Sequence, residues 1–232
     1  EVPSVYQTQI NDLLLTALAQ AFQEWTGSNS LLIELEGHGR EDILDNIDLS
    51  RTVGWFTTIF PVLLDLGNNS HPGESLKTIK EQLRSIPQRG INYGVLRYLC
   101  NDTLIREKLE NLPQAAVRFN YLGQIDQITN NSSLFQPANE STGDNQSLRG
   151  HRDCLIEINS AIANGQLFLD WTYSQELYRE TTMQQLTEGF IEKLRSLISH
   201  CQSPNSGGYT PSDFPQMEFD PAELDSLLSE LD

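Results

Sequence analysis

A carboxylate and an imidazole stand between glycines in the segment Glu36-Gly-His-Gly-Arg-Glu41. Glu36 follows a short apolar run and precedes a glycine, which has no Cβ and lets a ligand approach the backbone closely. A carboxylate in such a place can take up or return a proton during a reaction. The alternative is that Glu36 is a solvated acid at the end of a strand, with no chemical role.

Asn120 and Tyr121 form a second candidate pair, within the run Phe119-Asn-Tyr-Leu122. An amide and a phenol can both donate hydrogen bonds to an oxygen that gains negative charge in a reaction. Equally, Tyr121 could pack in the core while Asn120 ends the strand. His38 lies two residues after Glu36, so an extended chain would turn it to the same side. There it could tune the carboxylate or bind substrate, and a role in a turn is the alternative.

The same segment does not predict a nucleotide or metal site. Gly37-His-Gly39 lacks the third glycine of a dinucleotide fingerprint, and the acids Glu41 and Asp42 would repel phosphate. His38 and Asp42 have no further ligand at a spacing typical of metal sites. Arg40 is interpreted as an ion-pair partner.

Charge and composition narrow the classes of partner. The 232 residues include 15 Lys and Arg against 32 Asp and Glu, for a net charge of −17. This balance argues against nucleic acid and against an anionic membrane surface. No apolar run approaches the ~18 residues of a membrane span, and the N-terminus lacks the features of a signal peptide. Three widely spaced cysteines without a CxxC pair favour a cytoplasmic location.

Hydrophobic periodicity predicts the elements that would hold these residues. A helix is expected over 8–26, because one face collects apolar residues at helical spacing and Gly27 follows. Further helices are expected over 76–86 and 182–199, with short helices in 94–110. Strands are expected over 30–36, 52–66 with an interruption at Pro61, 115–122, 153–162 and 166–174. Asn164-Gly165 between the last two is typical of a tight hairpin.

These elements predict one α/β lobe with a mixed sheet and packed helices over 1–203. Residues 124–149 are predicted to form a long polar loop. Residues 204–232 are interpreted as a linker and an acidic tail, in which 221–231 could form a short helix or remain disordered.

Several segments, in order along the chain, resemble motifs of one family. They are Asn11-Asp-Leu-Leu-Leu-Thr-Ala17, Glu36-Gly-His-Gly-Arg-Glu41, Arg51-Thr-Val-Gly-Trp-Phe-Thr57 with Phe60-Pro61, Ile91-Asn-Tyr-Gly94 and Phe119-Asn-Tyr-Leu-Gly-Gln124. Together, over about residues 5 to 215, they resemble the later motifs of the epimerization domains of nonribosomal peptide synthetases. The second and last segments favour epimerization over condensation domains.

The resemblance implies a fold similar to chloramphenicol acetyltransferase, in which two lobes enclose a tunnel. It places the family's catalytic glutamate at Glu36. It also implies an aminoacyl or peptidyl substrate on the phosphopantetheine of a peptidyl carrier protein, and no cofactor of the domain's own. The family's first lobe carries a His-His-x-x-x-Asp motif, whereas none of the four histidines here is adjacent to another. The chain is therefore expected to be the C-terminal lobe, inactive without its N-terminal lobe.

Two other functions remain open at this point. One is an amide-forming condensation domain, which shares the fold. The other is a non-catalytic member of the fold that recruits carrier proteins or partner enzymes.

Overall fold

The computed structural model describes residues 2–41, 43, 47–68, 71–125, 140, 143, 147, 150–204 and 206–216. Its longer helices are α1 (Ile10–Thr26), α2 (Pro72–Arg84), α4 (Thr103–Glu110) and α6 (Glu180–Cys201), and a short α3 (Ile91–Gly94) continues into a π-helical turn at Val95–Leu99. Its strands are β1 (Ser30–Gly37), β2 (Thr58–Asp65), β3 (Val117–Gln124), β4 (Ile156–Ala163) and β5 (Gln166–Tyr173).

Helix α1 begins and ends at residues that suit those positions. At its start, the backbone N–H of Gln9 donates to the Asp12 carboxylate over 2.7 Å, which is half of a capping box. At its end, Gly27 has φ +75°, a left-handed conformation that glycine adopts without strain. The helix predicted over 8–26 is therefore confirmed.

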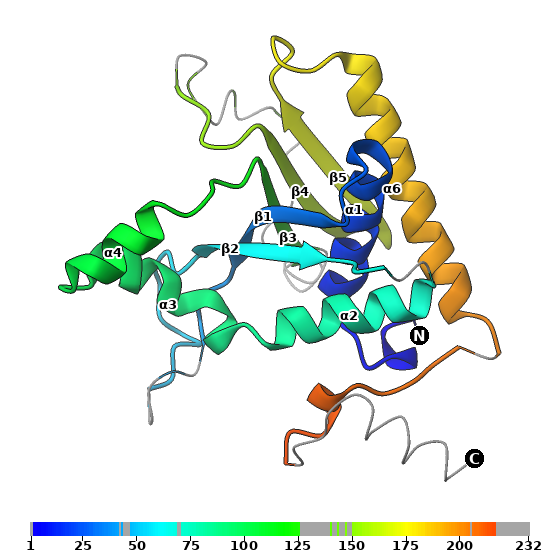
Figure 1. The fold of residues 1–232 in the computed structure, drawn as a ribbon, viewed down its shortest axis with the longest axis horizontal. Coiled ribbons are helices and arrows are strands. Elements are labelled where there is room, and N and C mark those ends of the chain that lie inside the picture. The colour runs from blue at the N-terminus through cyan, green and yellow to red at the C-terminus, as the bar shows by residue number, and fades with distance from the viewer. Residues whose placement is uncertain are drawn as a thin grey trace.

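The five strands form one mixed sheet in the order β2-β1-β3-β4-β5 (Figure 1). The three central strands, β1, β3 and β4, run parallel, while the edge strands β2 and β5 are antiparallel to their neighbours. Because β1 and β3 are parallel, their carboxyl ends meet at the same edge of the sheet. The predicted α/β lobe with a mixed sheet is confirmed.

The two faces of this sheet differ. Helices α1, α2 and α6 contact one another, and their apolar side chains join those of the sheet in one core cluster that includes Leu18, Ile33 and Phe190. On the opposite face, Leu63, Leu122 and Phe168 are each more than half exposed. The alternation along the strands therefore buries one face and leaves the other open to solvent.

The prediction of an interruption at Pro61 is wrong. Strand β2 runs through Pro61, which pairs with Glu34 of β1. Proline lacks an N–H donor, but β2 is an edge strand, where that position does not need to serve a second neighbour.

The strand also starts later than predicted, at Thr58 instead of residue 52. The backbone carbonyls of Leu49 and Thr52 accept hydrogen bonds from the Arg40 guanidinium, so they hold a loop and not a strand ladder. Arg40 also stacks over the Phe56 ring at 4.3 Å. Among the described residues, Arg40 thus forms contacts that shape this loop and no ion pair.

The segment after α6 returns to the lobe. Lys80 of α2 is almost completely buried, and its ammonium donates to both carboxylate oxygens of Asp213, at 2.6 and 2.7 Å, and to the Tyr6 carbonyl. Thr210 is buried as well, and the Gly208 N–H donates to Val5. Although their composition suggests a linker, residues 206–214 pack against α2 and the N-terminal turn. The helix considered over 221–231 and most of the loop 124–149 lie outside the described residues.

Candidate active site

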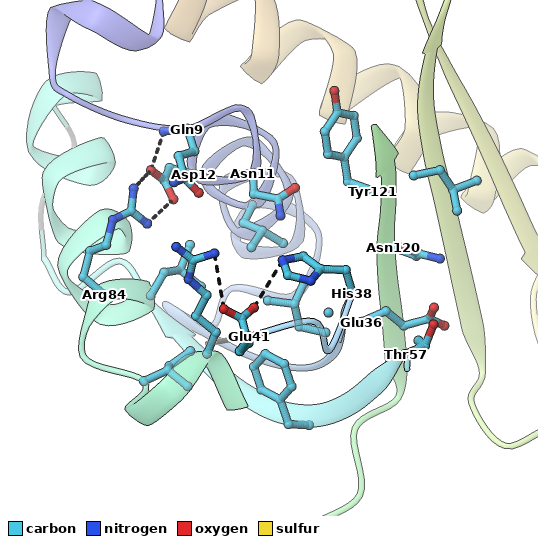
Figure 2. Close-up of a pocket in the computed structure, with 18 of the residues that line it drawn as sticks. Gln9, Asn11, Asp12, Glu36, His38, Glu41, Thr57, Arg84, Asn120 and Tyr121 are labelled. Carbon is cyan, nitrogen blue, oxygen red and sulfur yellow. Dashed lines mark hydrogen bonds and ion pairs between the residues drawn. The ribbon is translucent and has the colours of Figure 1, made fainter. Parts of the chain in front are cut away.

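A pocket of about 550 Å³ opens at the carboxyl ends of β1 and β3 (Figure 2). Helices α1 and α2 and the segments that follow β1 and α2 complete its walls. All four residues singled out in the sequence line it. Its polar lining comprises Gln9, Asn11, Asp12, Glu36, His38, Glu41, Thr57, Arg84, Arg89, Asn120 and Tyr121.

The parallel pairing of β1 with β3 brings Glu36 beside Asn120. The register pairs Glu34 with Arg118 and Leu35 with Phe119, so the next position along joins Glu36 and Asn120. In Figure 2 the Glu36 carboxylate and the Asn120 amide point to the same side of β3. A carboxyl group and an amide therefore emerge together on the uncovered face of the sheet.

Tyr121 lies on the other side of the same strand. Its ring packs against the core cluster, and Figure 2 shows it turned away from Asn120, toward the side of α1. Burial raises the pKa of its phenol, so the hydroxyl stays protonated over a wider range and remains a donor. The pocket thus reaches around the ends of the strands and is lined by Asn120 on one side and Tyr121 on the other.

His38 does not point to the side of Glu36, as an extended chain would have placed it. The strand ends at Gly37, and the His38 ring turns toward Glu41 (Figure 2). Its Nδ1 accepts the Arg40 N–H at 3.0 Å, which assigns the proton to Nε2, 3.2 Å from the Glu41 carboxylate. Both ring nitrogens are therefore engaged, while the ring itself lines the pocket.

The carboxyl group of Glu36 is partly buried, and this loss of solvation raises its pKa. Arg118 works in the opposite direction, while the negative charges of Glu157 and Glu34 raise the pKa further. Arg118 is held by Glu34, to which it donates from Nε and Nη2 at 2.9 and 2.7 Å. The result is a carboxyl group whose pKa lies above the ordinary value for glutamate.

Two lining residues that were not proposed from the sequence form an ion pair whose acid is buried. Asp12 is almost completely buried, and Arg84 of α2 donates to its two carboxylate oxygens at 3.2 and 2.7 Å. This pair ties the start of α1 to the end of α2 and so fixes one wall of the pocket. Asp12 and its neighbour Asn11 stand in one of the segments that carry the family resemblance, but no pattern there indicated which side chains face a cavity.

Gly39 holds the loop that carries His38 and Glu41. It has φ +64°, and a Cβ at this position would overlap the carbonyl oxygen of Phe56. We expect Gly39→Ala to lower the free energy of unfolding by more than about 2 kcal/mol, or to displace the loop, since the positive φ alone costs about 1–2 kcal/mol.

Gly67 is a matched control for this prediction. It has φ +60° but nothing within 4 Å of an added Cβ, so Gly67→Ala should cost only the backbone strain. Urea unfolding of both variants measures the difference. Equal losses of stability would show that the close approach of Phe56 to Gly39 does not matter.

The described part of the chain contains no helix that is long and apolar enough to cross a membrane. Within the same residues, no group of three or more His, Cys, Asp or Glu side chains is arranged to hold a metal ion.

Comparisons with known proteins agree with the motifs. The chain is 47% identical over 227 residues to one of the linear gramicidin synthase proteins of Brevibacillus parabrevis, covering 98% of this chain and 3% of that protein. It is 45% identical over 235 residues to a chondramide synthase of Chondromyces crocatus, covering 100% of this chain and 6% of the synthase. The chain thus spans only a small part of the length of these relatives.

Solved structures give the same picture. The epimerization domain from the third module of tyrocidine synthetase B is similar with a TM-score of 0.77 and 37% identity, over 86% of this chain and 44% of that one. The condensation domain of the enacyloxin polyketide synthase, at 14% identity and a TM-score of 0.60, shares the fold. The model of the condensation domain family matches residues 1–218, so the chain belongs to that family, in a form that resembles the epimerization domains of nonribosomal peptide synthetases.

Proposed function

We propose that this chain is one lobe of an epimerization domain, which converts the L to the D configuration at the α-carbon of a carrier-bound aminoacyl or peptidyl thioester. The observation that carries this proposal is the setting of Glu36, a partly buried carboxyl group of raised pKa on a pocket wall, with the Asn120 amide beside it. The identity of 37% to an epimerization domain supports it further.

Inversion at an α-carbon requires two proton transfers on opposite faces. A base removes the α-proton, and the electron pair moves into the thioester carbonyl to give an enolate. An acid on the other face then returns a proton to the α-carbon while the carbonyl re-forms. We propose Glu36 as one of these two groups, because its raised pKa brings its two protonation states closer in energy at neutral pH.

The second group would come from outside the described pocket. The chain covers 44% of the solved epimerization domain, so a second lobe facing the pocket fits the proposal. The resemblance implies a histidine of the His-His-x-x-x-Asp motif in that lobe. Asn120 and Tyr121 are proposed to donate to the enolate oxygen or to orient the thioester, and His38 is proposed to contact the substrate. The substrate would reach the pocket on the phosphopantetheine arm of a peptidyl carrier protein.

The choice between epimerization and condensation is tested with a single loaded carrier. Condensation needs a second, acceptor amine, whereas epimerization does not. An intact synthetase that carries this chain should convert an L-aminoacyl carrier to a mixture of L and D forms with no acceptor present, as measured by chiral chromatography after thioester cleavage. An aminoacyl group that stays entirely in the L form, and leaves the carrier only when an acceptor amine is added, would contradict the proposal. A recruiting role without catalysis predicts neither change.

The raised pKa of Glu36 predicts a pH dependence with a defined sign. Where Glu36 takes the proton, only its carboxylate works, so the rate should fall as pH drops through the raised pKa. Where it donates the proton, the rate should fall as pH rises through the same pKa. Arg118 lowers this pKa, so Arg118→Met should shift the pH dependence of the rate to higher pH in both directions.

The measurement is kcat/KM against pH in both directions, for the wild type and Arg118→Met. If the pH profiles of the wild type and Arg118→Met coincide, the titrating group is not Glu36.

A further inference from the structure

One polar atom of the pocket lining is buried and has no hydrogen-bond partner in the part of the chain that the structure describes. Asn11 of α1 lines the pocket, and its Oδ1 is buried without a hydrogen bond. Figure 2 shows its amide directed from α1 toward the space that Tyr121 and His38 also line. A buried amide oxygen without a donor destabilises a fold, and for this reason native proteins contain few of them. The position of Asn11 therefore calls for a role other than stability.

The two acids of the pocket lining near Asn11, Asp12 and Glu41, are already paired. The carboxylate of Asp12 is held by Arg84 and by the Gln9 N–H. Glu41 is shared between His38 at 3.2 Å and Arg89 at 3.6 Å. Each of these acids faces a group that can bear positive charge or donate a hydrogen bond, so the surroundings of Asn11 favour a neutral ligand group over an ammonium.

The rest of this wall is apolar, with Leu15, Leu35, Phe60, Leu83 and Ile86 among the lining side chains. In such surroundings a hydrogen bond is stronger than in water, and an unmatched polar group is more costly. A carboxamide offers both an acceptor and donors, and it rotates readily about χ2 to present either. Its best neutral complement is another amide, which can donate N–H to Oδ1 and accept from Nδ2.

We infer that Asn11 binds an amide group of the thioester substrate, either in the phosphopantetheine arm or in a peptidyl chain. This inference rests on the proposed function, because it assumes a carrier-bound thioester in this pocket. It assigns Asn11 to substrate binding and not to proton transfer.

Three small probes separate the two sources of the amide. An aminoacyl pantetheine has amides only in the arm, a dipeptidyl ethyl thioester has one only in the acyl group, and an aminoacyl ethyl thioester has none. Asn11→Leu in the intact synthetase should weaken binding of an amide-bearing probe roughly five- to tenfold, as expected for one hydrogen bond. Binding of the probe without an amide should be unchanged. The probe whose binding weakens shows whether the amide belongs to the arm or to the acyl group.

Stability gives an independent readout. Asn11→Leu removes an unsatisfied buried group, so resistance to urea should be unchanged or raised while binding falls. Asn11→Ser, which is smaller and lacks the amide, should reproduce the loss of binding if the leucine does not fit. Gln20→Leu, on the same helix but away from the pocket, should leave all three affinities unchanged.

Equal weakening of all three probes, or of none, by both Asn11 variants would overturn the inference. The proposed function can be contradicted independently of the role of Asn11. A wild type that binds the probes through Asn11 but leaves the substrate L-configured contradicts epimerization alone. A wild type that epimerizes, with Asn11 variants that bind every probe equally well, contradicts only the role of Asn11.

Discussion

Replacing Glu36 by glutamine in the intact synthetase should slow inversion at the α-carbon about 10²- to 10⁴-fold in at least one direction. Glutamine keeps the shape of the side chain but cannot take up or return the proton. The Glu36 side chain forms none of the hydrogen bonds or ion pairs found among the described residues, so its replacement should leave folding and carrier binding nearly intact. Chiral analysis of the product, started separately from the L and D thioesters, measures both directions.

Glu34 provides the matched control. It lies two residues earlier on the same face of β1, is held by Arg118, and does not line the pocket. Glu34→Gln should therefore change the rate far less than Glu36→Gln. If Glu36→Gln inverts the substrate at the wild-type rate in both directions, Glu36 is only an acid at the end of a strand.

The buried ion pair between Lys80 and Asp213 should dominate the stability of the C-terminal segment. Among the described residues, Asp213→Ala would leave the buried Lys80 ammonium with the Tyr6 carbonyl as its one remaining partner, and uncompensated buried charges of this kind cost about 3–5 kcal/mol. The same change releases the Thr210 turn, since Asp213 also accepts the Thr210 N–H at 2.9 Å. Urea unfolding of the purified chain measures the loss.

An exposed pair on the same helix serves as the comparison. Lys77 and Glu74 lie 3.1 Å apart with the acid about half exposed, so Glu74→Ala should cost less than about 1 kcal/mol. If Asp213→Ala is equally mild, the segment after α6 is only loosely attached to the lobe.

Much of the fold follows from local sequence patterns. The apolar face of 8–26 and Gly27 suffice for α1, and Asn164-Gly165 joins β4 to β5 with positive φ at both residues, as the dipeptide predicts. The interruption predicted at Pro61 is absent because an edge strand can accommodate a proline. The position of β2 at the edge of the sheet is a tertiary property that the local sequence does not show. The segment around Asp213 has the composition of a linker, and it packs because of tertiary contacts such as the ion pair with the buried Lys80.

Part of the candidate site could also be predicted from the sequence. The motifs placed Glu36, Asn120, Tyr121 and His38 together, and all four line one pocket. Which way each side chain points depends on where β1 ends, so the predicted direction of His38 is wrong. Asn11 gave no signal in the sequence, because a polar atom is recognised as unpartnered only when everything around it is known.

Uptake of solvent deuterium at the α-carbon tests the proposed epimerization most directly. Incubated in D₂O with an L-aminoacyl carrier and no acceptor amine, the intact synthetase should yield D-configured thioester that carries one deuterium at the α-carbon. That result requires removal of the original proton and delivery of a new one from the opposite face. A substrate that remains L-configured and free of deuterium at the α-carbon, in a preparation that binds the carrier normally, would contradict the account.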